Sequence, residues 1–150
     1  KLESLREASA DDVGGIAQLI EPFENDGTLV KRSRTEIERD ASLYTVLEHD
    51  GVIFACAALY PYPEARTGEM AALTVSPQSQ GQGDGEKVLK RIEQRARAAG
   101  LQSIFVLTTR TMHWFLKRGF EVVDPDWLPE ARKRKYNWDR KSQVLVKKLG

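Results

Sequence analysis

The sequence predicts an α/β fold, or α+β in a stricter classification, with a mixed central sheet flanked by helices. Two observations carry this prediction. The β-rich runs 43–48 and 52–60 flank Asp50-Gly51, a dipeptide typical of hairpin turns, so we expect them to pair antiparallel. A strand at 69–75, a Gly-rich loop, a helix and a strand at 103–108 form a β-α-β unit, whose strands run parallel. A sheet that contains both units is mixed.

Caps and periodicity predict the remaining elements. Ser9, with an acid three residues later, and Ser33 are typical helix N-caps. Apolar side chains at helical spacing predict the helix of the β-α-β unit, and Gly100 is a typical residue just beyond its end. The elements expected outside the two units are helices over 13–20, 33–40 and 113–118 and strands over 120–123 and 143–148.

Size and composition predict one domain, spanning residues 1–150. A chain of 150 residues that is 41% hydrophobic and 30% charged can bury a core without staples. Cys56 is the only cysteine and no Cys/His cluster has ligand spacing, so we expect no disulfide and no metal. The longest apolar run, 52–60, is too short to span a membrane, and the N-terminus has no signal-peptide pattern. We therefore expect a cytoplasmic protein without a membrane partner.

The loop from Gln80 to Gly85 is the first candidate for a binding site. It lies between a strand and a helix N-terminus, where glycines let a ligand approach the backbone and unpaired N–H groups favour an anion. A flexible turn explains the glycines equally well. Their G-x-G-x-G spacing is not that of a dinucleotide-binding strand-helix turn, and the chain has no P-loop motif.

Two longer runs resemble a known family. LTVSPQSQGQGDGEKVLKRI (73–92) and IFVLTTRTMHWFLKRGF (104–120) resemble the acetyl-CoA motif and following helix of the GNAT family of N-acetyltransferases. Blocks at 55–64, 68–77, 106–115 and 128–145 resemble, more narrowly, the acetyltransferase domain of bacterial N-acetylglutamate synthases. The resemblance implies the GNAT fold and an acetyl-CoA site made by Leu73, Val75, Gln80, Gly81, Gln82, Gly83 and Gly85.

The resemblance also implies a reaction, in which the acetyl group of acetyl-CoA passes to the α-amine of L-glutamate as the first step of arginine biosynthesis. Two carboxylates favour forked guanidinium donors, and Arg32, Arg140 and Ser142 match the family's substrate-binding positions. Lys31, Arg34 and Lys141 are close enough to leave the choice within each cluster open.

The catalytic residues that the resemblance implies are Glu69 and Thr108. An amino acid's amine must lose a proton before it attacks a thioester, and Glu69 stands at the family's proposed base. The usual acid of the family is a tyrosine, but Phe115 stands at its position here and cannot donate a proton. A thiol with a pKa of about 8.5 leaves tolerably as its anion. We expect Thr108 to assist this leaving thiolate.

Two alternatives stay open at this point. A GNAT enzyme of the same fold could acetylate another small amine or a protein N-terminus. The basic segment 131–148, with Tyr136 and Trp138, could bind nucleic acid, although a pI near 8.0 argues against it and we expect no such partner. Full-length relatives are expected to carry an N-terminal amino-acid-kinase-like domain and to form homo-oligomers through it; this chain shows nothing of that domain.

Overall fold

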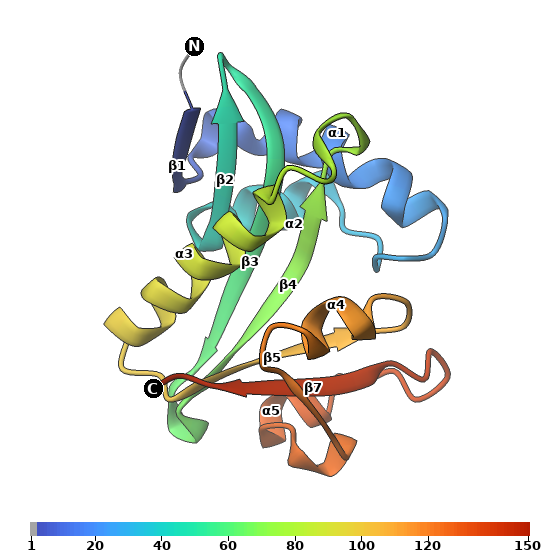
Figure 1. Cartoon of the computed structure of the whole chain (residues 1–150). Coiled ribbons are helices and arrows are strands. Elements are labelled where there is room, and N and C mark those ends of the chain that lie inside the picture. Colours follow the sequence, from blue (N-terminus) through green and yellow to red (C-terminus); the bar gives the residue numbers. More distant parts are fainter. Residues whose placement is uncertain (1–2) are drawn as a thin grey trace.

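The computed structural model describes residues 3–150 and confirms the predicted fold class. Seven strands form one mixed sheet in the order β1-β2-β3-β4-β5-β7-β6 (Figure 1). The strands are β1 (Glu3–Glu7), β2 (Tyr44–His49), β3 (Val52–Tyr62), β4 (Thr67–Val75), β5 (Ser103–Thr108), β6 (Glu121–Val123) and β7 (Gln143–Lys148). The helices are α1 (Val13–Asn25), α2 (Arg34–Arg39), α3 (Asp84–Ala98), α4 (Met112–Leu116) and α5 (Glu130–Lys133).

Two elements are absent from the sequence prediction. Strand β1 has no β-rich run, yet it pairs antiparallel with β2 along its whole length. Helix α5 has only four residues and follows Pro129, so periodicity could not detect it. Helix α1 also continues to Asn25, well beyond the predicted end at residue 20. Among residues 3–150, no helix is both long and apolar enough to cross a membrane.

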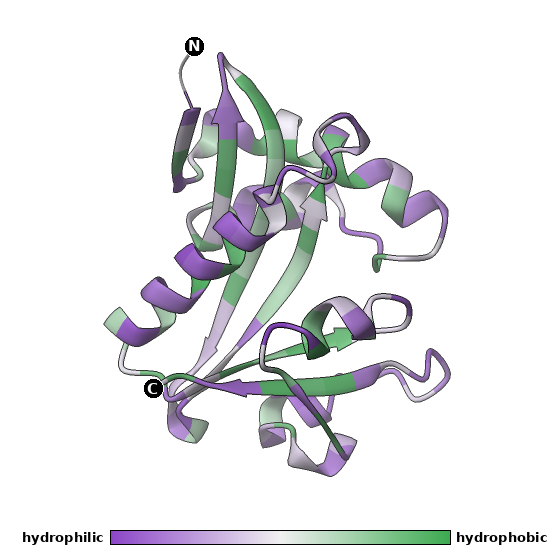
Figure 2. Cartoon of the chain, in the orientation of Figure 1, coloured by the Kyte–Doolittle hydropathy of each residue, from purple (hydrophilic) through white to green (hydrophobic). Residues whose placement is uncertain are grey.

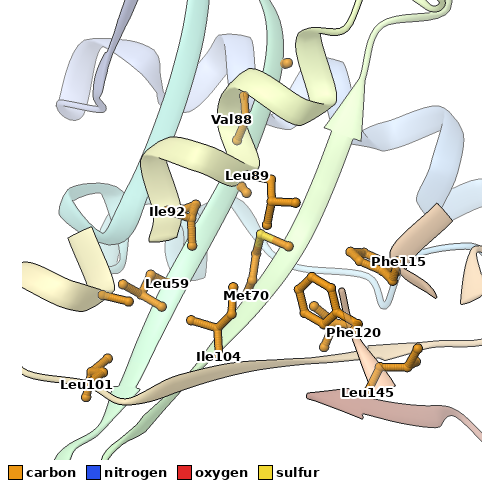
Figure 3. Packing of buried hydrophobic residues seen from close by; sticks show 14 of the residues in the cluster. Leu59, Met70, Val88, Leu89, Ile92, Leu101, Ile104, Phe115, Phe120 and Leu145 are labelled. Carbon is orange, nitrogen blue, oxygen red and sulfur yellow. The ribbon is translucent and has the colours of Figure 1, made fainter. Parts of the chain in front are cut away.

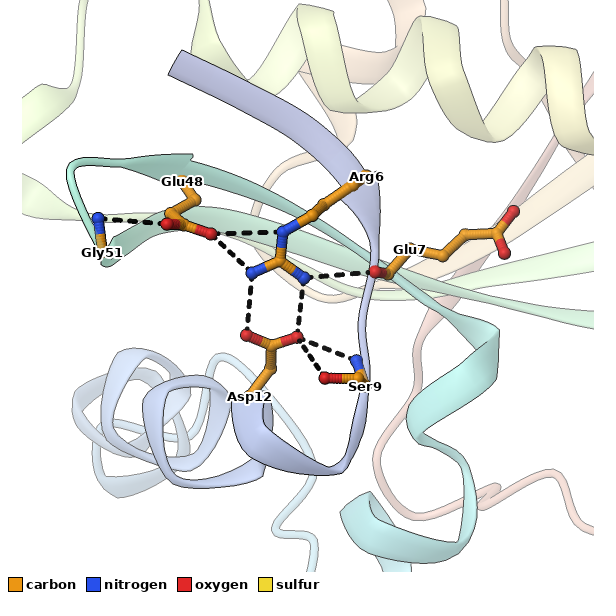
Figure 4. Close-up of polar contacts among 6 residues, drawn as sticks. All are labelled: Arg6, Glu7, Ser9, Asp12, Glu48 and Gly51. Carbon is orange, nitrogen blue, oxygen red and sulfur yellow. Dashed lines mark hydrogen bonds and ion pairs between the residues drawn. The ribbon is translucent and has the colours of Figure 1, made fainter. Parts of the chain in front are cut away.

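Arg6 joins β1 to the rest of the fold. Its guanidinium donates to both carboxylate oxygens of Asp12, at 2.8 and 2.9 Å, and also to Glu48 on β2 (Figure 4). Asp12 in turn accepts from the backbone N–H of Ser9 at 2.8 Å, which realises the predicted cap. The hydrogen bond from Arg6 lowers the pKa of Asp12. This network therefore connects the edge strand, the start of α1 and the β2–β3 hairpin.

Strands β4 and β5 pair over only three residues. The parallel register runs from Thr67↔Ser103 to Glu69↔Phe105, and beyond it the two strands diverge (Figure 1). Strand β7 pairs antiparallel with β5 along its whole length, and β6 pairs with β7. The sheet therefore consists of an N-terminal half, β1 to β4, and a C-terminal half, β5, β7 and β6. The β5-facing N–H and C=O groups of β4 beyond Glu69 have no strand partner.

One face of the sheet carries a continuous apolar core under α3 and α4. Met70 of β4, Ile92 of α3, Phe115 of α4 and Leu145 of β7 belong to one buried cluster (Figure 3). The outward side of α3 is polar, whereas the strands beneath it are largely apolar (Figure 2). Because its members come from both halves, this cluster fixes the halves relative to each other.

The opposite face carries two separate clusters. Helices α1 and α2 cover β2 to β4 through residues such as Ile16 and Ile37, while the segment around α5 covers β5 and β7 through Leu128 and Tyr136. The small cluster under α5 contains Phe105, Leu128, Tyr136, Val144 and Val146. The space between the two clusters is open to a ligand, as described below.

A bulge in β4 changes which face its side chains occupy. Met70 pairs with Leu59 and Ala71 with Ala58, but the next pair is Thr74 with Cys56, so β4 has one extra residue here. Ala72 adopts φ 58°, a left-handed conformation that is strained for alanine. The extra residue places Leu73 and Val75 against the α3 cluster, whereas Glu69 lies on the opposite face.

Candidate functional site

Two adjoining cavities lie where β4 and β5 diverge. The first, of about 380 Å³, lies between the coil 28–32, β4, β5 and the segment 132–142; we call it the cationic cavity. The second, of about 520 Å³, lies beside the Gly-rich loop and α4; we call it the loop cavity. Both are lined by Thr28, Leu29, Leu73, Thr111 and Phe115. A ligand can therefore extend from one cavity into the other through the neck that these five residues form.

Glu69 is the one acidic residue of the cationic cavity, and it is 9% exposed. Its Oε1 accepts a hydrogen bond from Nε of Arg132 at 2.7 Å, in an ion pair whose side chains are both largely buried. The other carboxylate oxygen is not engaged by this bond. The ion pair thus holds an ionised carboxylate at a defined place, with an oxygen left to accept a proton or a hydrogen bond.

Four cationic side chains line the same cavity: Arg32, Arg132, Lys135 and Arg140. Glu69 neutralises one of them, so the cavity carries a net charge of about +3 at neutral pH. Such a cavity attracts anions and favours an acceptor with more than one carboxylate. Ser142, which is buried, completes the predicted substrate-binding set, so Arg32, Arg140 and Ser142 all line one cavity.

Arg140 also links two segments that line the cationic cavity. Its Nη2 donates to the carbonyl oxygens of Gly27 and Thr28, at 3.1 and 2.9 Å. Arg110, in the turn after β5, donates to the hydroxyl of Thr28 at 3.2 Å. The coil after α1 is therefore tied to two segments of the C-terminal half, across the gap between the halves.

Arg32 lies above a buried layer of phenols. Burial lowers the pKa of its guanidinium, but Tyr44, Tyr60 and Glu69 raise it by more, so the side chain stays charged. Burial, together with a hydrogen bond to Asp40, raises the pKa of Tyr60, whose hydroxyl donates to that carboxylate at 2.9 Å. Tyr60 therefore donates to Asp40 near a fixed positive charge, whereas the buried hydroxyl of Tyr44 has no hydrogen-bond partner among the described residues.

Cys56 belongs to the core under α1, as its small apolar neighbours in the sequence predict. It is fully buried, and burial raises the pKa of its thiol to about 12. Its Sγ contacts the carbonyl oxygen of Ala72 at 3.6 Å. A thiol with this environment is protonated at neutral pH and does not serve as a nucleophile.

The Gly-rich loop forms a wall of the loop cavity, and its glycines let a ligand approach the backbone of the loop closely. Gly81 and Gly83 adopt φ 88° and 79°, and a Cβ on Gly85 would lie 3.3 Å from the side chains of Trp114 and Val75. Six of the seven predicted acetyl-CoA residues line this cavity: Leu73, Val75, Gln80, Gly81, Gly83 and Gly85. Gln82, the seventh, is exposed and is not among the residues that line the cavity, so its place in the site stays a prediction.

The loop cavity also has the electrostatic features of an anion site. The first N–H groups of α3 have no partner within the helix. Arg118 contributes a guanidinium that lies 3.8 Å over the Trp114 ring, and its buried Nε has no hydrogen-bond partner among the described residues. Glu86 lies 3.6 Å from this guanidinium, and Lys87 lies 3.8 Å from the buried carboxylate of Asp84. The acids near the loop are thus each close to a cation.

Thr108, the predicted thiolate-assisting residue, lines the cationic cavity at the end of β5. Its Oγ1 accepts backbone N–H bonds from Arg110 and Thr111, at 3.2 and 3.0 Å, and lies 2.7 Å from Oγ1 of Thr111. The hydroxyl of Thr108 therefore caps the turn that leads into α4. Thr111, whose hydroxyl lies beside it, is one of the five residues that form the neck.

Several lining residues escaped the sequence analysis. Arg132 and Lys135 lie within a block recognised as specific, but 63 residues separate Arg132 from Glu69 and no local pattern connects them. Trp114 packs against the core under α3 and α4 and also forms a wall of the loop cavity. The missed lining residues with polar or aromatic side chains include Thr28, Thr111, Trp114, Arg118, Arg132, Lys135 and Asn137.

Comparison with known proteins agrees with this geometry. Residues 11–120 match the acetyltransferase (GNAT) family. The amino-acid acetyltransferases of Ralstonia nicotianae and Escherichia coli strain K12 are 65% and 48% identical over 148 residues, which cover 99% of this chain and 33% of each relative. A solved structure of N-acetylglutamate synthase from Neisseria gonorrhoeae, complexed with coenzyme A and N-acetyl-glutamate, superposes with a TM-score of 0.95 at 43% identity, covering 100% of this chain and 36% of that one. The chain therefore spans about a third of the curated relatives it matches.

Proposed function

The chain belongs to the GNAT family of acetyltransferases, and from this premise we propose that it transfers the acetyl group of acetyl-CoA to the α-amine of L-glutamate. The observation that carries the proposal is the cationic cavity, with four cations and one carboxylate, which opens into the loop cavity. The named relatives and the bound ligands of the Neisseria enzyme support the same reaction.

The loop cavity is the proposed acetyl-CoA site. A pyrophosphate carries its charge on oxygens that backbone N–H groups bind well, and glycines remove the side chains that would keep it away. Gly81, Gly83, Gly85 and the first turn of α3 would hold this group, and Arg118 supplies a buried donor that lacks a partner. Gln82 belongs to the same proposed site, and since its side chain is exposed, the contact we expect there is through its backbone.

The cationic cavity is the proposed glutamate site. Glutamate with a neutral amine carries two negative charges, and three cations remain after Arg132 has paired with Glu69. Arg32 and Arg140 line the cavity from the coil after α1 and from the segment before β7, so the site offers one guanidinium for each carboxylate. A neutral acceptor would leave these charges without a counterion, which penalises binding.

Glu69 is the proposed base. It takes a proton from the ammonium group of glutamate, directly or through water, and Arg132 holds its carboxylate in place meanwhile. The neutral amine attacks the carbonyl carbon of the thioester; a C–N bond forms, the C–S bond breaks, and the electron pair leaves with sulfur. The nitrogen is positively charged after the attack and gives its second proton to solvent water, so the amide forms neutral and CoA leaves as the thiolate. The β5-facing backbone groups of β4 beyond Glu69 are free to bind the reacting acetyl and pantetheine groups.

Because the chain spans a third of its curated relatives, assembly is a separate proposal. We propose that the homo-oligomer implied by the resemblance forms through an amino-acid-kinase-like domain outside these 150 residues. The proposed acetyl transfer, the first step of arginine biosynthesis, places both ligands in the two cavities described here.

The test is thiol release from acetyl-CoA with L-glutamate, L-glutamine, L-aspartate or no acceptor. We expect release to require glutamate, with glutamine slower by a factor of 10 or more in kcat/KM because one carboxylate is lost. Equal rates with neutral amines or an N-terminal peptide would instead establish another acceptor on the same fold. Binding of acetyl-CoA without release from any acceptor would refute catalysis by this chain on its own.

A further inference from the structure

The neck between the two cavities is where the reacting sulfur must lie. Acetyl-CoA bound in the loop cavity can present its acetyl group to the cationic cavity only by passing its thioester through this neck. Of the five residues that line both cavities, Leu29, Leu73 and Phe115 are apolar. Hydroxyl groups are supplied by Thr28 and Thr111, which are therefore the candidate donors to a departing thiolate.

The hydrogen-bond pattern around Thr108 orients its proton. A hydroxyl oxygen has one proton to donate and two lone pairs to accept with. The backbone N–H groups of Arg110 and Thr111 occupy both lone pairs of Thr108 Oγ1. Of the two hydroxyls 2.7 Å apart, Thr108 must then be the donor and Thr111 the acceptor. The proton of Thr111 is consequently directed away from Thr108.

We propose that Thr111, and not Thr108, is the hydroxyl that contacts the leaving sulfur, while Thr108 acts through it as a positioning residue. This inference rests on the proposed acetyl transfer. When the C–S bond breaks, the electron pair stays on sulfur, which leaves as the thiolate and accepts the Thr111 O–H bond. Thr111 keeps its proton. The amine loses two protons, of which Glu69 holds the first and solvent water takes the second, so charge and atoms balance.

Thr28 is the weaker of the two candidates. It lies in the coil between α1 and α2, and its Oγ1 accepts from the exposed Arg110 side chain at 3.2 Å. Both threonine hydroxyls therefore accept one hydrogen bond, but the donor to Thr28 is an exposed side chain. The donor to Thr111 is the Thr108 hydroxyl, which two backbone N–H groups of the turn between β5 and α4 hold in place.

The experiment compares Thr111→Val, Thr111→Ser, Thr108→Val and Thr28→Val in steady-state kinetics and in the ionisation of bound CoA, followed by the ultraviolet absorbance of its thiolate. We expect Thr111→Val to lower kcat about 10- to 100-fold, the usual effect of a hydrogen bond to a charged group, with both KM values within about twofold. Thr111→Ser retains the rate, and Thr28→Val loses less than Thr111→Val. Thr35→Val, which changes an exposed threonine of α2 outside both cavities, is the control and stays near wild type. Bound CoA should ionise at a higher pH in Thr111→Val.

Three results would overturn this assignment: a wild-type kcat in Thr111→Val, a larger loss in Thr28→Val, or a loss in Thr108→Val that Thr111→Val does not share. Circular dichroism of each variant separates misfolding from lost chemistry, and Thr111→Ser provides a folded reference. The ionisation of bound CoA needs no acceptor. It therefore tests Thr111 even if glutamate proves to be the wrong substrate, which keeps the two proposals distinguishable.

Discussion

The two faces of the sheet differ in whether their apolar packing is continuous. Under α3 and α4 one apolar cluster crosses the line where β4 and β5 separate, while the opposite face has two clusters with the cationic cavity between them. The continuous core keeps the halves at a fixed angle, so the gap on the other face stays open. The charged side chains can contact a ligand only where the packing is interrupted, because elsewhere on the sheet neighbouring side chains cover the buried groups.

Strand β4 contributes side chains to both faces of the sheet. Met70 packs in the continuous core, whereas the neighbouring Glu69 points into the cationic cavity. The proposed base is thereby one residue away from the continuous core, and this neighbour restricts its motion. The following predictions either break this division between the faces or measure it, from the largest expected effect to the smallest.

Removing the base should have the largest effect. We expect Glu69→Gln to lower kcat for glutamate-dependent thiol release by about 10² to 10⁴, the usual contribution of a general base. Glutamine keeps the shape but cannot accept the proton. Glu64→Gln, an exposed acid in the turn before β4, is the matched control and should retain full activity. A near-normal rate in Glu69→Gln would assign the proton to another group.

The unequal sizes of the clusters predict unequal effects of core truncation. Ile92→Ala, in the continuous core, should lower the free energy of unfolding by about 2–5 kcal/mol and reduce hydrogen-exchange protection in both halves. Leu128→Ala, in the small cluster under α5, should cost nearer to 2 kcal/mol and expose mainly β7 and the segment after β6. Denaturant titration with hydrogen exchange measures both. Loss of protection throughout the chain in Leu128→Ala would show that the two faces are not independent.

Arg140 spans the gap, so its loss should affect substrate binding more than folding. We expect Arg140→Gln to raise KM for glutamate about 10- to 100-fold, since a charged hydrogen bond to a carboxylate and the tie to Gly27 and Thr28 are both lost. Arg134→Gln, an exposed cation of the same segment outside the lining, is the control. An unchanged KM for glutamate would remove Arg140 from the acceptor site.

The Arg6 network stabilises the β1 edge of the sheet, away from the site. Its contribution to stability should depend on pH. Arg6 lowers the pKa of Asp12, so the ion pair contributes stability above the ordinary aspartate pKa of about 4 and loses it as pH falls through the lower folded value. We expect Arg6→Gln to cost about 1–2 kcal/mol at pH 7 and little near pH 2. Arg39→Gln, which breaks an exposed pair with Asp40, should change stability little. A pH-independent loss in Arg6→Gln would contradict the linkage.

The smallest effect concerns the backbone of the loop. Gly83 adopts φ 79° and no atom lies within 4 Å of a Cβ built there, so Gly83→Ala meets strain but no clash. We expect a loss of about 1 kcal/mol in the free energy of unfolding, measured by denaturant titration. Gly51→Ala, at φ 85° in the β2–β3 turn, is a matched control with equal freedom around its Cβ. A much larger loss at Gly83 alone would indicate a further constraint on the loop.

Much of the site was predictable once the residues had been matched to a family. Glu69, Arg32, Arg140 and Ser142 were named from separate blocks of sequence, and the structure brings them to one cavity. The Gly-rich loop was located by its composition and by its place between a strand and a helix. Arg132 and Thr111 were not, because their roles depend on contacts with residues that are remote in sequence or on the direction of one proton.

The sequence by itself determined the alternating strands, the capped helices, the turn glycines and the mixed sheet, because each depends on interactions within a few residues. Only the tertiary structure decided where β4 bulges and where β5 leaves it. Regular alternation would place Leu73 and Val75 on the face of Glu69, but the extra residue at Ala72 turns them to the α3 core. Both positions depend on how β4 packs at once against β3, β5 and the cores on the two faces of the sheet. These contacts join residues that are remote in sequence, so no local pattern predicts them.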